Sequence, residues 1–195
     1  MEDPYALFFE EPWVLYGHVY SGSFMYLNSY IFLGKVSSIG DYFNLFHHAP
    51  SASQLYNQTI ILEGKKTVAF SFFKHNVLPE WEDPINKKGS EWGCRDNIPG
   101  GLFQTMWDTF TLAAVNSEFD NVVGVRCINK TNKGRLLYKI EIWMDTDDIV
   151  KANSVLEKMK SLFDTDLPLF IHMLHEDKQQ QANEYSKKKK KQCNK

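Results

Sequence analysis

The sequence has few cysteines and lacks the short motifs that mark the common catalytic and metal sites. Its three cysteines are Cys94, Cys127 and Cys193, and no two of them form a CxxC pair. This spacing argues against a disulfide framework and against a structural zinc site, so we expect a reducing compartment. There is no GxxxxGK[ST] phosphate loop, no GxSxG motif and no local Cys–His signature, so nothing points to a P-loop NTPase or a serine or cysteine hydrolase.

Long apolar segments are also lacking. No stretch reaches the roughly 18 apolar residues that a membrane-spanning helix needs. The segment from Met1 to Pro12 is acidic and has neither the basic start nor the apolar run of a secretory signal. We therefore expect a soluble protein that is neither secreted nor bound to a membrane, located in the cytoplasm, with the nucleus as a further location.

Positive charge is scarce outside the C-terminus. Lys187 to Lys191 and Lys195 are six of the 22 basic residues, so residues 1–186 hold 16 basic against 24 acidic side chains, a formal charge of −8. An acidic body cannot hold nucleic acid through a broad phosphate-neutralising surface. Any contact with nucleic acid must be local and chemically specific.

Aromatic residues, in contrast, are abundant, at 14% of the 195 residues. This length suits one domain, and we expect an N-terminal extension over 1–11, a folded domain over 12–176 and a disordered basic tail over 177–195. Most of the aromatic side chains fill the core. Those that the local sequence forces outward are candidates for binding.

The hydropathy pattern predicts an α+β domain. Helical periodicity follows the Ser37-Ser38 pair, the Pro99-Gly100-Gly101 turn and Thr146, which is the expected N-cap of the last helix. These elements interleave irregularly, so we expect one curved antiparallel sheet with about three helices on its convex face. The expected strands are Val14–Tyr20, Tyr26–Leu33, Gln58–Leu62, Thr67–Phe73, Val122–Asn129, Leu136–Met144 and Leu169–Leu174.

The segment from Lys74 to Pro84 carries the most chemical information. Pro79 and Pro84 predict a loop, and Trp81 lies between them among carboxylates. By itself, such a tryptophan is either a plug folded onto the core or an exposed plate for stacking. The neighbouring Glu82 favours the second alternative, because its carboxylate accepts two hydrogen bonds and matches the N1–H and N2–H₂ donors of guanine.

The same segment resembles translation initiation factor 4E, the eukaryotic mRNA cap-binding family. The resemblance extends over roughly Pro12 to Leu174, and it implies that residues 12–176 form a cap-binding domain with the cap site on the concave side of the sheet. It rests on Trp13-x-Leu15-Tyr16, Tyr26, Pro79-x-Trp81-Glu82-Asp83, Asn86-Lys87-x-Gly89, Trp92, Trp107 and Ile140-x-Ile142-Trp143.

The resemblance implies an aromatic clamp for 7-methylguanosine. Trp81 is one wall and Tyr26 the other, where the family usually has tryptophan; Phe24 is the alternative second wall. Glu82 binds the guanine edge, and Trp143 packs against the N7-methyl group. The methylated base is a cation, so two aromatic faces attract it by about 2 kcal/mol beyond ordinary stacking.

The resemblance also assigns the cap phosphates to basic residues between two strands. Lys130 stands in the place of a family arginine and Lys139 in that of a lysine, and the loop between them adds Lys133 and Arg135. Without the resemblance, this loop is a solvated hairpin turn. Glu91 stands where many members have a basic residue, which predicts weaker phosphate binding.

The implied protein partner is a helical motif of an initiation-factor 4G-like scaffold or of a 4E-binding repressor. The matching positions are Ile39, Phe43 and Leu112, with Phe43 in the place of a family tryptophan. The alternative is that Ile39 and Phe43 form the buried stripe of an amphipathic helix. Asp108 and the Leu7-Phe8 pair also depart from the family pattern, so we expect an altered partner surface.

Enzymatic alternatives have less support. His172 and His175 lie in a segment that alternates like a strand, which points them to opposite faces and disfavours a metal site. An acidic cluster of Glu80, Glu82 and Asp83 is the best basis for a hydrolase. We therefore predict a monomeric, non-enzymatic cap-binding protein without cofactor or metal, which recruits a scaffold for translation initiation. The alternatives are a cap-binding translational repressor and an acid-cluster hydrolase.

Overall fold

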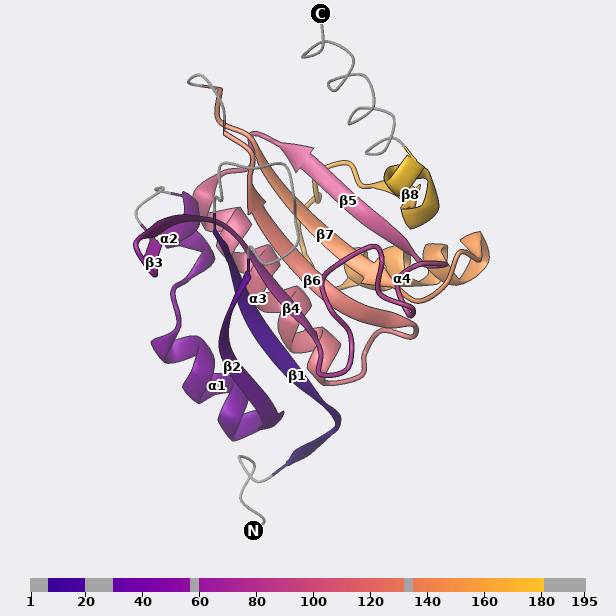
Figure 1. Ribbon diagram of the computed structural model, residues 1–195. Coiled ribbons are helices and arrows are strands. Elements are labelled where there is room, and N and C mark those ends of the chain that lie inside the picture. The colour runs from indigo at the N-terminus through magenta and orange to yellow at the C-terminus, as the bar shows by residue number, and fades with distance from the viewer. Residues whose placement is uncertain (1–6, 20–29, 57–59, 132–134, 181–195) are drawn as a thin grey trace, which may run out of the picture.

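The computed structural model describes residues 7–19, 30–56, 60–131 and 135–180. These form an eight-stranded sheet in the order β2-β1-β4-β6-β7-β5-β8, with the short β3 paired to β4, and every pairing is antiparallel (Figure 1). The strands are β1 (Phe8–Val19), β2 (Tyr30–Ser38), β3 (Ile61–Leu62), β4 (Lys65–Lys74), β5 (Ser90–Asp96), β6 (Val122–Asn129), β7 (Tyr138–Met144) and β8 (Ile171–Leu174).

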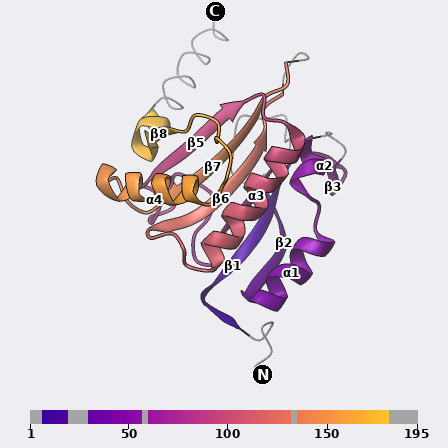
Figure 2. The ribbon, with the colours of Figure 1, turned by 180° about the vertical axis from the view of Figure 1, so that it is seen from behind.

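Three long helices and one short helix accompany the sheet. The long ones, α1 (Ile39–His48), α3 (Gly100–Val115) and α4 (Ile149–Ser161), cover one face, as the view from behind shows, while α2 (Ala52–Tyr56) lies beside the end of α3 (Figure 2). The predicted α+β class, with helices on one face of an antiparallel sheet, is confirmed. The short α2 was not expected. Among the described residues, no helix is long and apolar enough to cross a membrane.

The core lies between this sheet face and the helices. Because successive strand residues point to opposite faces, alternate side chains such as Phe70 and Phe72 of β4 face α1 and α3. Phe72 stacks on Trp13 at 5.3 Å, and Phe46 of α1 lies 6.2 Å from Trp107 of α3. The remaining buried core side chains include Val125, Cys127, Ile140, Ile142, Phe103, Met106 and Phe110.

The helix starts agree in part with the prediction. Ser38 caps α1 in a capping box with Asp41, as the Ser37-Ser38 pair predicted. The N-cap of α4 is Asp148 and not Thr146, because the Asp148 carboxylate accepts from the Val150 amide at 2.8 Å. The Thr146 hydroxyl, two residues earlier, instead accepts from the Asp148 amide. The expectation for Thr146 was therefore wrong by two residues.

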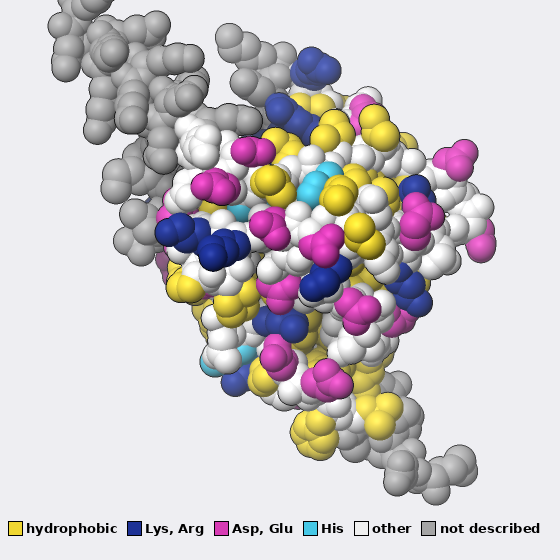
Figure 3. All heavy atoms as spheres, turned by 90° about the vertical axis from the view of Figure 1, so that its right-hand side faces the viewer, with side chains coloured by type: hydrophobic (Ala, Val, Ile, Leu, Met, Phe, Trp, Pro, Cys, Tyr) yellow, Lys and Arg dark blue, Asp and Glu magenta, His cyan; other side chains and the backbone are white. Residues whose placement is uncertain are grey.

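Two described segments near the chain ends differ from the expected boundaries. β1 begins at Phe8, inside the expected extension, and pairs Phe8 with Ser38 of β2. Residues 175–180 are helical, and Lys178 is buried although the tail was expected to start at 177. On the face in Figure 3, acidic side chains are interspersed among basic ones, as expected of an acidic body.

Candidate functional site

A row of polar side chains crosses the sheet face opposite the helices. Ser71 of β4 lies directly across from Arg126 of β6, which lies across from Glu141 of β7. The Arg126 guanidinium donates to the Ser71 hydroxyl at 3.1 Å and pairs with Glu141 at 3.4 Å. His18 of β1 joins the row through its Nε2, 2.7 Å from the same hydroxyl. All four side chains are buried, and two hydrogen bonds and one ion pair link them across strands β1, β4, β6 and β7.

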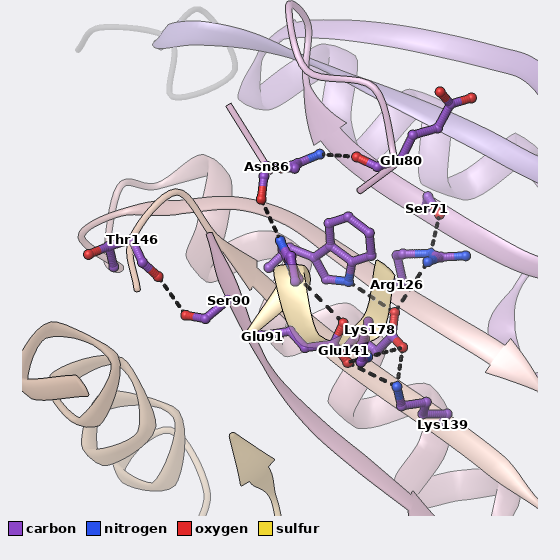
Figure 4. A network of polar contacts seen from close by, with 12 residues as sticks. Ser71, Glu80, Asn86, Ser90, Glu91, Arg126, Lys139, Glu141, Thr146 and Lys178 are labelled. Carbon is purple, nitrogen blue, oxygen red and sulfur yellow. Dashed lines mark hydrogen bonds and ion pairs between the residues drawn. The ribbon is translucent and has the colours of Figure 1, made fainter. Parts of the chain in front are cut away.

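Two carboxylates and three cations meet at one end of this row (Figure 4). Lys139 pairs with both Glu91 and Glu141, with its Nζ 2.9 Å from the Glu91 Oε1. Lys178 pairs with Glu91 and lies 3.7 Å from Glu141. Glu141 also accepts a hydrogen bond from the Trp143 indole nitrogen at 2.9 Å. We call Glu91, Arg126, Lys139, Glu141 and Lys178 the charged network.

Burial and charge act in opposite directions on the two carboxylates. Burial alone raises the pKa of Glu141, but Lys139, Arg126 and Lys178 outweigh it and hold that pKa well below the usual value. Burial, reinforced by the charge of Glu141, raises the pKa of Glu91. Glu141 is therefore the carboxylate that the cations hold in its charged form.

The connection between β4 and β5 lies over this face, and its own side chains fix its shape. The Asp83 carboxylate accepts from the amides of Leu78 and Ile85, each at 2.9 Å. The Asn86 amide donates to the carbonyls of Leu78 and Glu80 at 2.7 and 2.9 Å. Asp83 and Asn86 are both buried, so the backbone of this loop is held by internal hydrogen bonds.

Trp81 is partly packed and partly open on this loop. Its ring is nearly parallel to that of Trp143, with an interplanar angle of 8° and 6.4 Å between centroids. It packs on a small apolar cluster of Phe73, Val77, Val123 and Trp143. One side of the ring therefore packs on the core, as the plug alternative predicted. Trp81 is nevertheless only half-buried, and the neighbouring Glu82 is exposed. The pair can reach a ligand at the molecular surface.

Trp143 itself has no exposed surface in this conformation. Its side chain is 0% exposed, beneath Trp81 and against Phe73, with the Arg126 guanidinium 5.2 Å from its ring centroid. His175 packs on it at 4.4 Å between ring centroids. The resemblance assigned Trp143 to the N7-methyl group of the ligand; in this structure its ring lies beside Trp81 as a buried support for that ring.

Residues 175–180 add two side chains that the sequence did not place at this site. His175 donates from Nδ1 to the Asn86 carbonyl at 2.8 Å, and burial lowers its pKa to about 4. Lys178, one turn later, places its ammonium 5.8 Å from the centroid of the Trp81 ring. His172 lies apart, on Trp92 at 5.0 Å. Within the described ranges, no group of three or more His, Cys, Asp or Glu side chains is placed to hold a metal.

A match to a known protein family assigns this chain to that family. The sequence profile of the family described as Eukaryotic initiation factor 4E matches residues 8–192. The chain belongs to the eukaryotic initiation factor 4E family.

Relatives within the initiation factor 4E family are distant. Translation initiation factor 4E-4 of Caenorhabditis elegans is 25% identical over 134 residues, which are 67% of this chain and 56% of that protein. Factor 4E-2 of Schizosaccharomyces pombe is 32% identical over 78 residues, 38% of this chain and 30% of that protein. The matched part thus spans about a third to just over half of these curated relatives.

Solved structures of initiation factor 4E share the fold. Ascaris suum eIF4E-3, solved with an m2,2,7G cap, superposes with a TM-score of 0.71 at 18% identity, covering 87% of this chain and 91% of that one. A schistosome eIF4E, solved with m7GpppA and 4E-BP, gives a TM-score of 0.69 at 17% identity, covering 88% and 90%. At this identity the likeness establishes the fold.

The remaining residues assigned from the initiation factor 4E resemblance are placed as follows. Tyr26, its alternative Phe24, and Lys133 lie outside the described residues. Lys130 and Arg135 are exposed on the connection between β6 and β7. Lys139 is in the charged network, and Glu91, which stands where a basic residue is usual, is its partner there. Among Lys130, Arg135 and Lys139, the three that the structure describes, only Lys139 has an ion pair with carboxylates, so these phosphate cations are not equivalent.

The residues assigned to a protein partner lie on the helical face. Phe43 of α1 is 48% exposed, whereas Ile39 of α1 and Leu112 of α3 are half-buried. The two helices are joined by a hydrogen bond of 2.8 Å between the hydroxyls of Tyr42 and Thr111. Phe43 is thus not part of a buried stripe, and the buried residue of α1 is Tyr42.

Proposed function

We propose that this chain binds the 7-methylguanosine cap of mRNA as a monomer, without catalysing a reaction. The observation that carries the proposal is the pairing of a half-buried Trp81 with an exposed Glu82 on a loop braced by Asp83 and Asn86. A stacking plate and a carboxylate on one rigid loop are held in register with each other. The solved relatives with an m2,2,7G cap and with m7GpppA support the same ligand class.

Selectivity for the methylated base follows from charge. N7-methylation makes guanine cationic, so the Trp81 face gains a cation–π attraction of about 2 kcal/mol over stacking on a neutral base. The Glu82 carboxylate accepts from N1–H and N2–H₂ and also attracts the positive ring. One loop therefore reads both the identity and the methylation of the base. Tyr26 remains the predicted second wall.

Phosphate binding is the weaker half of the proposed site. Lys139 is held by Glu91 and Glu141, so its charge is largely neutralised before any phosphate approaches. We propose that Lys130 and Arg135, which are exposed, together with Lys133 make the principal phosphate contacts.

The acid-cluster hydrolase has a specific observation against it. A metal-dependent hydrolase would need Asp83 as a ligand, but both Asp83 oxygens accept backbone hydrogen bonds from Leu78 and Ile85. Asp83 therefore has a structural use, and Glu80 and Glu82 alone make a poor octahedral site. We propose that the protein acts by binding alone.

Retention on immobilised 7-methyl-GTP tests the proposed function. Wild-type protein is expected to be retained and to elute with 7-methyl-GTP but not with GTP. Glu82→Ala should lower the affinity for 7-methyl-GTP at least tenfold, because charge-assisted hydrogen bonds contribute about 1.5–3 kcal/mol. Glu157→Ala, at an exposed glutamate of α4, is the matched control and should bind as the wild type does. Retention that survives Glu82→Ala unchanged would rule out the proposed reading of guanine.

We further propose that the face of α1 and α3 binds a helical motif of an initiation-factor 4G-like scaffold or of a 4E-binding repressor. The exposed Phe43 ring, together with the half-buried Ile39 and Leu112, suits an apolar helix stripe. Which of the two partners binds decides whether the mRNA is translated or silenced. We propose a cytoplasmic location as well, where the buried free thiols Cys94 and Cys127 remain reduced.

A partner assay tests this surface. Phe43→Ala is expected to weaken binding of a scaffold-derived helical peptide about tenfold, because truncating a central aromatic anchor commonly costs more than 1 kcal/mol. Ile149→Ala is the matched control, since Ile149 is 49% exposed at the start of α4. Fluorescence anisotropy with labelled peptide measures both. Equal losses in the two variants would mean that Phe43 is no anchor.

A further inference from the structure

The ammonium of Lys178 occupies a site whose chemistry suits a cation. It pairs with Glu91, lies 3.7 Å from Glu141 and lies 5.8 Å from the centroid of the Trp81 ring. The side chain is only 9% exposed. Proteins hold organic cations against aromatic faces, and the two carboxylates add charge attraction to the same site. The same ring, Trp81, is the proposed stacking plate for the cationic base.

The segment that carries Lys178 is anchored to the sheet at its first residue, His175, which packs on Trp143. Of residues 175–180, only His175 and Lys178 are buried, three positions apart and so on one side of the helical turn. His175 anchors the turn through the Asn86 carbonyl and through its amide to the Gly89 carbonyl at 3.0 Å. Glu176 and Asp177 between them are exposed. Lys178 can therefore leave the network while His175 stays in place.

We propose that Lys178 is an internal competitor of the cap, which must leave the Trp81 face before the methylated base binds. This inference rests on the proposed function. With Lys178 in place, Glu91 and Glu141 face three cations: Arg126, Lys139 and Lys178. A cationic base that replaces the ammonium restores the same charge around the carboxylates, whereas a neutral base does not.

Competition of this kind sets the affinity and leaves the base preference unchanged. The displacement of Lys178 precedes the binding of either 7-methyl-GTP or GTP, so its free-energy cost is common to both ligands. Removing the ammonium should therefore raise the affinities for 7-methyl-GTP and for GTP by the same factor. If Lys178 instead contacted the phosphates of the bound nucleotide, its removal would lower both affinities. If it contacted the bound base, the ratio of the two affinities would change.

Titration calorimetry on full-length variants tests the proposal. Lys178→Ala is expected to bind 7-methyl-GTP and GTP about tenfold more tightly, the factor expected where about nine in ten free molecules hold the lysine in place. Lys178→Arg retains a cation and should show no gain. Lys160→Ala, at an exposed lysine of α4 paired with Glu157, is the matched control. Unchanged or weaker binding by folded Lys178→Ala overturns the proposal.

A second measurement on the wild type does not depend on the folding of a variant. Acetylation of lysines, read by mass spectrometry with and without 7-methyl-GTP, should find Lys178 protected in the free protein and more reactive in the complex. Greater protection on adding ligand overturns the proposal. If neither wild type nor variants bind 7-methyl-GTP, the proposed function fails and this inference fails with it. If the wild type binds but the variants and labelling do not respond as expected, only this inference fails.

Discussion

Replacing Trp81 with alanine is expected to lower the affinity for 7-methyl-GTP at least a hundredfold. Stacking on an aromatic side chain contributes about 1–3 kcal/mol, and the cation–π attraction of the methylated base adds about 2 kcal/mol. The loss for GTP should be smaller, because a neutral base forfeits stacking alone. Calorimetric titration with both nucleotides measures the two losses.

Two controls accompany this prediction. Trp81→Phe keeps a smaller aromatic face and should fall between wild type and Trp81→Ala. Because Trp81 also packs on Phe73, Val77 and Trp143, circular dichroism must establish that each variant is folded. A folded Trp81→Ala protein with an affinity within threefold of the wild type would mean that the base does not stack on this ring.

Replacing Glu141 with alanine is expected to lower the free energy of unfolding by about 3–5 kcal/mol, the usual cost of breaking a buried ion pair by removing one partner. Glu141 is buried and contacts the Arg126 guanidinium, the Lys139 ammonium and the Trp143 indole nitrogen. Its loss leaves Arg126 buried without a carboxylate partner among the described residues. Urea unfolding followed by tryptophan fluorescence measures the change.

The matched control and the pH dependence make this prediction specific. Glu157→Ala, which removes an exposed carboxylate on α4, should change the free energy of unfolding by less than about 0.5 kcal/mol. The folded-state pKa of Glu141 is depressed, so its contribution is present above the unfolded pKa of about 4.3 and is lost as the pH falls through the lower folded value. The difference between wild type and Glu141→Gln should therefore shrink on acidification. A difference that is constant down to about pH 2 would contradict the assigned ion pairs.

Much of the fold could be predicted because its signals are local. Ser38 and the periodicity of Ile39, Phe43 and Phe46 lie within one helix, and α1 begins where they predicted. β5 was missed because its sequence, Ser90 to Asp96, contains charged residues and a glycine and reads as polar. Glu91 lies inside nonetheless, since it meets Lys139 of β7 and Lys178 after β8. A single sequence does not reveal partners that only the sheet order brings together.

In the candidate site, too, features with a local sequence signal could be predicted, and contacts between distant residues could not. The position of Trp81 and Glu82 on a loop could be predicted, because the prolines on either side of them are close in the chain. Lys139 was predicted as a phosphate ligand, but its carboxylate partner Glu91 is 48 residues away, and nothing local signals that pairing. Lys178 was assigned to a polar tail by composition, which cannot register one buried ammonium. Arg126 and Glu141 are charged residues inside apolar strands, and this pattern in the sequence could have indicated a buried ion pair.

The bracing of the loop by Asp83 and Asn86 has a consequence for the thermodynamics of recognition. The backbone that carries Trp81 and Glu82 is already ordered by hydrogen bonds to Leu78, Glu80 and Ile85, so little conformational entropy remains to be lost when a ligand arrives. Under the proposed competition, the affinity of this site is limited by the displacement of Lys178 from the Trp81 ring and not by the ordering of the loop. Changes at the exposed position 82 can then alter which base is recognised without refolding the loop.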